Sequence, residues 1–158
     1  MEYAEYQQQA RRTMDQTFTP EERIELCLWG ISGEVGEVID LYKKERFHRR
    51  PRDKDKYRKE IGDVVWYVAN LCHETSRNFI PFRMHFHGEN EADILRDILR
   101  EAAKMAGDNP QWILTRLVHL AKKLDLGPFE EILDLNIAKL RARYPDGFST
   151  EASLARKD

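Results

Sequence analysis

The stretch that decides the fold is GISGEVGEVID, Gly30–Asp40, which has the pattern of a helix although it carries three glycines. Apolar residues within and around it recur every three or four positions, as on the buried face of a helix. Each glycine costs a helix interior about 1 kcal/mol relative to alanine. The three glycines form one edge of the helix that carries no side chains. We therefore expect this edge to allow a close approach, either by a neighbouring helix or by a flat ligand.

Helix signals continue through nearly the whole chain, and the alternating pattern of strands is almost absent. Thr19, Pro20 and Glu22 form a strong helix start. We expect helices at about 3–15, 20–45, from Asp53 or Asp55 to 75, from Asn90 to 106, 109–123 and 129–143, followed by a polar surface tail. With 158 residues, this order predicts one all-α domain (1–158) built as a helical bundle.

Composition narrows the possible classes of protein. A formal net charge of −2 gives no general attraction to nucleic acid or to a membrane surface. The two cysteines, Cys27 and Cys72, stand in apolar helical segments and are expected to be buried, reduced thiols. No apolar run approaches the roughly 20 residues that span a bilayer, and the N-terminus lacks the apolar core of a signal peptide. We therefore expect a cytoplasmic protein without a membrane partner.

Two pairs of acidic residues stand in unusually apolar surroundings. Glu34 and Glu37 are three residues apart and share a helix face, as do Glu60 and Asp63. No lysine or arginine stands among the apolar residues around the first pair or in the ten residues after Asp63. Because the chain reverses between the pairs, the two helices can lie antiparallel with all four carboxylates facing each other.

A partly buried carboxylate needs a compensating partner. A metal cation is the simplest one here, and four oxygen ligands favour Mg²⁺ or Mn²⁺ over Zn²⁺. The alternative is a polar seam between two helices.

The most basic part of the chain lies between the two acidic pairs. From Lys43 to Lys59 there are ten lysines and arginines against three acids. Such a run is often a solvated loop, but beside a carboxylate-bound metal it can offset the charge of phosphates. Only Phe47 and Tyr57 are interleaved as aromatic residues, which argues against nucleic acid as a partner.

Three segments, GISGEVGEVIDLYKK, KEIGDVVWYVANL and NIAKLRARYPDGFS, resemble the MazG-like nucleoside triphosphate pyrophosphohydrolases of the all-α NTP pyrophosphatase superfamily. The pattern of that family is E-x-x-E, a spacer, E-x-x-D and an asparagine seven positions on. Here it falls on Glu34, Glu37, Glu60, Asp63 and Asn70. The opening EYQQQARRT is also similar to the family. The resemblance covers about 3–75 and 127–150, which leaves 76–126 as an inserted helical pair.

The resemblance implies hydrolysis of NTPs or dNTPs between the α- and β-phosphates by metal-activated water, giving a nucleoside monophosphate and pyrophosphate. Glu34, Glu37, Glu60 and Asp63 would hold Mg²⁺, with Mn²⁺ as a substitute, and Glu34 or Glu37 would orient or deprotonate the water. It also implies a homodimer or homotetramer. The candidate substrate-binding residues are Lys43, Lys44, Asn70, Asn136, Lys139 and Arg143.

Several alternatives stay open at this point. Relatives in the superfamily include dUTPase- and dCTPase-like enzymes that sanitise the nucleotide pool, and a non-catalytic helical module that binds nucleotides or a protein is a different class. Trp66 and Tyr67 can stack near a base or belong to the core. His85 and His87 can bind a transition metal or serve the surface. The insertion can cover the pocket, contact a partner subunit or bind something else.

Overall fold

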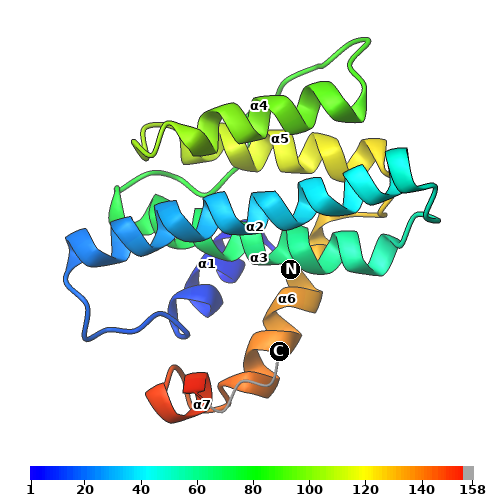
Figure 1. The fold of residues 1–158 in the computed structure, drawn as a ribbon. Coiled ribbons are helices and arrows are strands. Elements are labelled where there is room, and N and C mark those ends of the chain that lie inside the picture. The colour runs from blue at the N-terminus through cyan, green and yellow to red at the C-terminus, as the bar shows by residue number, and fades with distance from the viewer. Residues whose placement is uncertain (155–158) are drawn as a thin grey trace.

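The computed structural model describes residues 1–154, and α-helices are the regular structure of that range (Figure 1). The helices are α1 (Tyr3–Arg11), α2 (Pro20–His48), α3 (Lys54–Glu74), α4 (Glu91–Ala103), α5 (Pro110–Lys123), α6 (Phe129–Arg143) and α7 (Thr150–Leu154). The predicted all-α fold is confirmed, and the short α7 stands where only a polar tail was expected. Within residues 1–154, no helix combines the length and the low charge that crossing a bilayer requires.

The predicted helix starts are found with their caps in place. At the start of α2, the Thr19 hydroxyl accepts the backbone N–H of Glu22, and the Glu22 carboxylate accepts the backbone N–H of Thr19. Asp53, rather than Asp55, caps α3 with its side chain. Asn90 does the same for α4. These bonds satisfy donors that the first turn of a helix leaves open.

Three helix ends differ from the prediction. Helix α1 stops at Arg11, where the backbone N–H groups of residues 12, 13 and 14 bond to carbonyls three residues back, and the hydroxyl of Thr13 also donates to one of these carbonyls (2.8 Å). Helix α2 runs on to His48 and ends where Arg49 takes a left-handed conformation (φ 54°). Helix α4 ends at Ala103, a few residues earlier than expected.

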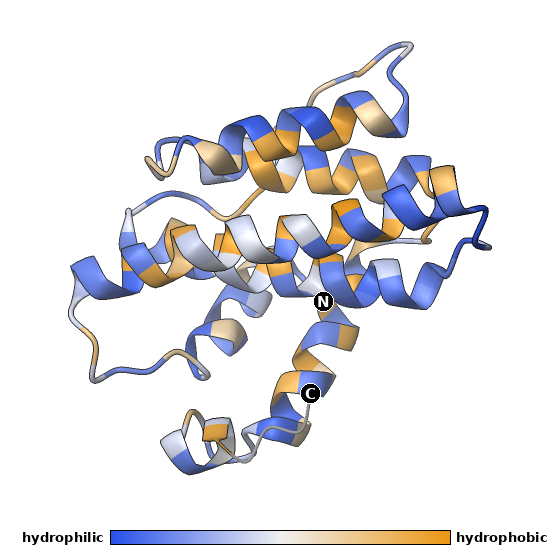
Figure 2. Ribbon diagram, in the orientation of Figure 1, coloured by the Kyte–Doolittle hydropathy of each residue, from blue (hydrophilic) through white to orange (hydrophobic). Residues whose placement is uncertain are grey.

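The helices form three layers with α3 in the middle. Figure 1 shows α4 and α5 on one side of the α2–α3 hairpin and α1 and α6 on the other, and α3 contacts α1, α2, α5 and α6. The apolar stripes of the helices turn towards one another (Figure 2). The buried face of α3 carries Ile61, Val64, Val65, Val68, Leu71 and Cys72. The α4–α5 pair therefore completes the core behind the α2–α3 hairpin.

A buried arginine holds the α4–α5 pair together. Arg116 of α5 is 1% exposed and donates to both carboxylate oxygens of Glu89 (2.9 and 3.0 Å). Its Nε lies 3.1 Å from a carboxylate oxygen of Asp97 on α4, and its guanidinium lies 4.5 Å from the centre of the Phe86 ring. These hydrogen bonds lower the pKa of Glu89 below its usual range. One cation thus links the segment between α3 and α4 to both α4 and α5.

Arg116→Leu should destabilise the protein by about 3 kcal/mol, because removing one partner of a buried pair leaves its carboxylates uncompensated. Arg100→Ala is the matched control, since Arg100 also pairs with Asp97 but is 70% exposed, and should cost less than about 1 kcal/mol. Urea denaturation followed by circular dichroism measures both values. Equal stability of the two variants would show that the buried arginine is not the anchor of the insertion.

Candidate active site

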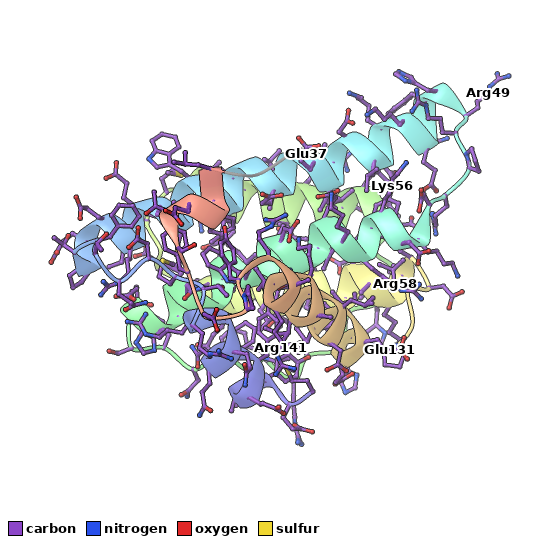
Figure 3. The ribbon with its side chains drawn as sticks, turned by 90° about the horizontal axis from the view of Figure 1, so that it is seen from below. Glu37, Arg49, Lys56, Arg58, Glu131 and Arg141 are labelled. Atoms are coloured by element: carbon purple, nitrogen blue, oxygen red, sulfur yellow. The ribbon has the colours of Figure 1, made fainter. Side chains whose placement is uncertain are left out.

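Three carboxylates meet where α2 and α3 run side by side. Glu34 of α2 and Glu60 and Asp63 of α3 each place one carboxylate oxygen within 4.8 Å of the other two, and all three residues are half-buried. The antiparallel arrangement expected from the sequence brings them together. Glu37, the fourth predicted ligand, is exposed on α2 and lies outside this group (Figure 3).

The donor set suits a hard cation. It consists of carboxylate oxygens, the ligands that Mg²⁺ and Mn²⁺ prefer. Two oxygens bound to one Mg²⁺ lie at most about 4.2 Å apart, so the carboxylates need to approach by only about half an ångström. Without a cation, each pair of charges at this separation repels by about 3 kcal/mol at an effective dielectric constant of about 20. The residues present therefore fit a metal ion.

Asp63 is held by two donors from α6. The ammonium of Lys139 and the side-chain amide of Asn136 (3.0 Å) both bond to its Oδ1. The amide oxygen of Asn136 in turn accepts the hydroxyl of Tyr6 at 2.8 Å. Gly62 lets α6 come this close, because a Cβ there would lie 3.1 Å from the Cβ of Asn136.

Tyr6 is a residue of the site that the sequence motifs did not single out. It is completely buried in α1. Burial, aided by the charge of Asp63, raises the pKa of Tyr6 well above its usual value, so the hydroxyl stays protonated and donates. This donation fixes which end of the Asn136 amide faces Asp63. The only sequence signal was its place in EYQQQARRT, the opening that is similar to the family.

The glycine edge of α2 is covered at one end and open at the other. A Cβ on Gly30 would lie 2.2–2.4 Å from the ring of Tyr67, so this aromatic side chain rests directly on the backbone of α2. Gly33 and Gly36 have nothing within 4 Å of an added Cβ. The expected close approach by a neighbouring helix is therefore found at Gly30, through Tyr67 of α3, and among the described residues it is not found at Gly33 or Gly36.

A pocket of about 290 Å³ opens beside the acidic cluster. Glu34 and Asp63 lie on its wall together with the cations Lys139 and Arg143. Its aromatic lining comes from the loop before α2, from α3 and from the segment that follows α6, namely Phe18, Trp66, Tyr67, Tyr144 and Phe148. None of the described residues that line it belongs to 76–126. The inserted helices therefore do not cover this pocket.

Trp66 and Tyr67 are half-buried walls of the pocket rather than fully buried core. The indole N–H of Trp66 donates to the hydroxyl of Thr13 at 2.8 Å, and the two rings meet edge to face at 4.8 Å. Both rings are thus fixed before any ligand enters.

Three predicted substrate-binding residues lie elsewhere. Lys43 and Lys44 both bond to Asp40, and these bonds lower the pKa of Asp40 to about 2. With a rise of about 1.5 Å per residue, they stand roughly 13 Å beyond Glu34 along α2. Asn70 is 1% exposed and donates to the carbonyl of Trp66. The other three, Asn136, Lys139 and Arg143 of α6, are brought to the acidic cluster or its pocket.

The basic run gathers at the far end of the α2–α3 hairpin. Figure 3 shows Arg49 at that tip, well apart from Glu37. Several of its cations have local acidic partners, such as Arg52 with Glu45 and Lys54 with Asp125. This arrangement matches the solvated loop that the sequence allowed.

Comparison with known proteins addresses the resemblance directly. Residues 22–84 match the family model of the MazG nucleotide pyrophosphohydrolase domain. This segment of the chain is therefore similar to that domain. The matched segment contains Glu34, Glu60 and Asp63, whereas the α6 residues of the pocket lie beyond it. Neither a curated protein nor a solved structure matches the chain.

Gly30→Ala and Gly33→Ala should have opposite effects on stability. At position 33 the new methyl group meets open space, so the better helix propensity of alanine should stabilise the protein by about 0.5–1 kcal/mol. At position 30 the methyl group overlaps the Tyr67 ring, so the same substitution should destabilise it. Urea denaturation of the two variants measures the difference, and a Gly30→Ala variant as stable as Gly33→Ala would contradict the observed packing of Tyr67.

Proposed function

We propose that this MazG-like chain is a Mg²⁺-dependent nucleoside triphosphate pyrophosphohydrolase that releases a nucleoside monophosphate and pyrophosphate. The observation that carries the proposal is the cluster of three carboxylates beside a pocket with aromatic walls and two cations. The walls suit the flat face of a base. The carboxylates, through a metal, and the cations suit the triphosphate.

In this proposal Glu34, Glu60 and Asp63 hold the metal. Both donors to Asp63 occupy its Oδ1, which leaves Oδ2 to face the ion. Glu37 is exposed about one turn further along the same helix, so its side chain can turn towards the cluster as a fourth ligand. Mg²⁺, or Mn²⁺ in its place, would neutralise phosphate charge and lower the pKa of a water molecule.

The remaining residues position the reacting groups. Glu34 or Glu37 orients the attacking water and accepts its proton. The water oxygen attacks the α-phosphorus in line, the bond from that phosphorus to the bridging oxygen breaks, and pyrophosphate leaves. Lys139 and Arg143 stand on the wall of the pocket beside Asp63 and stabilise the charge that develops on the leaving group. Asn136 keeps Asp63 oriented through all of these reaction steps.

Two alternatives concern the same pocket. A dUTPase- or dCTPase-like enzyme would share the acidic cluster and differ in which base and sugar it accepts. A non-catalytic nucleotide-binding module would not need several carboxylates in one cluster, since they repel a triphosphate unless a metal is bound.

The deciding experiment is pyrophosphate release from a panel of NTPs and dNTPs with Mg²⁺. At least one nucleotide should be turned over, and Glu60→Gln and Asp63→Asn should each lower kcat/KM by roughly 100-fold or more, because each removes a charge that holds the metal. Glu25→Gln, an exposed acid of α2, is the control and should retain activity. Product analysis should give the monophosphate rather than the diphosphate.

A failure to hydrolyse any nucleotide would refute the enzymatic proposal. Equal activity of Asp63→Asn and Glu25→Gln would refute the assignment of the site. A preference confined to dUTP or dCTP would favour the pool-sanitising alternative.

Tyr6→Phe tests the positioning of Asp63 from a distance. Among the residues of the site, the hydroxyl of Tyr6 bonds to Asn136, which in turn bonds to Asp63. Loss of such an outer hydrogen bond typically costs about 10- to 100-fold in activity or metal affinity. We expect kcat/KM to fall by about tenfold while the helical circular dichroism spectrum stays unchanged. Tyr42→Phe, on the other side of the α2–α3 hairpin, is the control. An unchanged kcat/KM in Tyr6→Phe would exclude a positioning role.

We further propose that the protein works in the cytoplasm as a homodimer or homotetramer. Large apolar side chains on the outer surfaces of α2 and α4 support self-association, since Trp29, Phe47 and Leu99 are 64%, 72% and 45% exposed. Sedimentation equilibrium would measure the mass of the assembly.

A further inference from the structure

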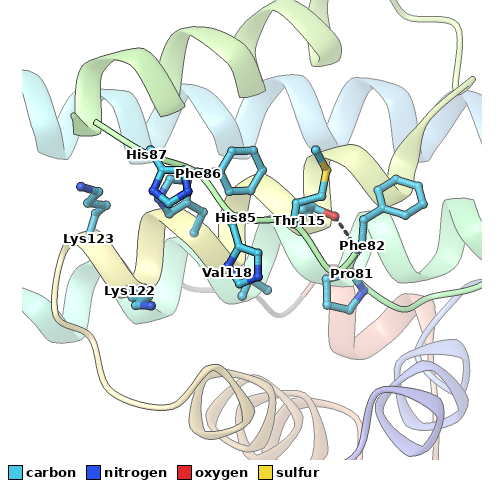
Figure 4. A pocket seen from close by; sticks show the side chains of 11 residues that line it. Pro81, Phe82, His85, Phe86, His87, Thr115, Val118, Lys122 and Lys123 are labelled. Atoms are coloured by element: carbon cyan, nitrogen blue, oxygen red, sulfur yellow. Dashed lines mark hydrogen bonds between the residues drawn. The ribbon is translucent and has the colours of Figure 1, made fainter. Parts of the chain in front are cut away.

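A second pocket, of about 650 Å³, lies on the inserted segment between residues 81–87 and α5 (Figure 4). Its volume is within the range of about 300–1,000 Å³ that is typical of small-molecule sites. Its lining includes three histidines and two lysines but no aspartate or glutamate. This is unusual in a chain where acids outnumber lysines and arginines.

The pocket has a charged end and an apolar end. Figure 4 shows His87, Lys122 and Lys123 towards one end, Pro81 and Phe82 towards the other, and His85 between them. Phe82 is 42% exposed, so its ring is available to a ligand. The shape thus suits a molecule with an anionic head and an apolar body.

The carboxylates nearest to the charged end are already bonded elsewhere. Glu89 is held by both terminal nitrogens of Arg116, and Asp125 pairs with Lys54 at 2.6 Å. Among residues 1–154, neither Lys122 nor Lys123 forms an ion pair. Neither charge is therefore taken up by an ion pair within the described part of the chain, although Glu89 interacts with Lys123 over a longer distance.

The end of α5 does not cancel this positive charge. The C-terminus of a helix carries partial negative charge on its free carbonyl groups. Here the carbonyls of residues 120, 121 and 122 accept backbone N–H groups from residues 124, 126 and 125. These carbonyl groups are thus less free to offset the positive charge of the two lysines.

The walls of the pocket are fixed in place. The backbone N–H of Phe82 donates to the hydroxyl of Thr115 at 2.9 Å. His119 is nine-tenths buried and stacks on Phe86 with ring centres 4.6 Å apart, and its Nδ1 lies 3.5 Å from a carboxylate oxygen of Glu89. The connector 81–87 is therefore attached to α5 at both ends of the pocket, which reduces the ordering that a ligand must induce.

We propose that this pocket binds a small organic phosphate, with the phosphate at Lys122, Lys123 and His87 and the apolar body against Pro81 and Phe82. Lysines and imidazole N–H groups donate to phosphate oxygens, and the ring of Phe82 packs on a flat apolar group. The site shares no lining residue with the acidic pocket. It belongs to α5, whereas the acidic pocket lies on the α1–α6 side of the hairpin. The proposal does not depend on catalytic turnover.

The test is a titration of uniformly ¹⁵N-labelled, EDTA-treated protein with phenyl phosphate, followed by amide chemical shifts. Without metal, the acidic cluster repels phosphates, so binding there is suppressed. We expect shifts at residues 81–87 and 115–123, with a Kd of about 1 mM or tighter. Inorganic phosphate should bind more weakly, because it lacks the apolar body. A nucleoside monophosphate in the same titration distinguishes a nucleotide, if it binds more tightly than phenyl phosphate, from a simpler phosphate ester.

The double variant Lys122→Glu/Lys123→Glu should weaken binding of phenyl phosphate at least about tenfold, since two attractive charges become repulsive. Lys56→Glu/Lys104→Glu is the control with the same change in charge at two exposed lysines elsewhere and should bind as the natural chain does. His87→Ala is a milder second variant, expected to weaken binding several-fold. Shifts confined to the residues around Asp63 and Lys139, no shifts at all, or equal affinity of the two double variants would overturn the proposal.

Discussion

Helix α3 has to serve two opposite environments, and the rest of the structure depends on this constraint. One face is a continuous apolar surface that needs burial, and the other carries Glu60 and Asp63 close to a third carboxylate. The helix contacts α1, α2, α5 and α6, so helices cover it on both sides. Burial of the apolar face fixes the rotation of α3 about its axis. That rotation aims the two acids at α2.

The acidic face is ordered by charge rather than by packing alone. Three carboxylates in one place favour any arrangement that supplies a cation, and Lys139 supplies one at Asp63. Tyr6 and Asn136 add hydrogen bonds that hold the same carboxylate from behind. These contacts run from α1 through α6 to α3, and α1 and α6 both pack on the hairpin. The site is thus assembled from parts of the chain that are far apart in sequence.

The sequence predicted most of the fold because its signals are local. The capping residue of α2 and the apolar spacing of its face act within a few residues, so helix type, order and most starts were correct. The pairing of Glu34 with Glu60 and Asp63 was also predictable, since one reversal of the chain is enough to bring two helices together. Helix ends were less accurate, because the change to a tighter turn after Arg11 of α1 has no distinct signal in the sequence.

The rest of the site depends on distances that a sequence does not contain. Lys43 stands near the acidic motif in sequence, but a helix converts nine residues into roughly 13 Å, and Asp40 takes its charge. Tyr6 is far from the motif in sequence, but α1 packs on α3 and α6 and so delivers its hydroxyl to Asn136. In both cases, distance along the sequence was a poor guide to distance from the acidic cluster, because the helices set how far apart the side chains lie.

The insertion changes what the two sides of the hairpin can do. Because α4 and α5 bury the apolar face of α2 and α3 within the same chain, that face is not free for another partner. The insertion in turn presents its own outer surface, where the second pocket lies on α5. Helix α3 contacts α5 on one side and carries Asp63 on the other. A ligand that shifted α5 would therefore act on the acidic cluster only through α3, so any coupling between the two pockets has to pass along the packed face of that helix.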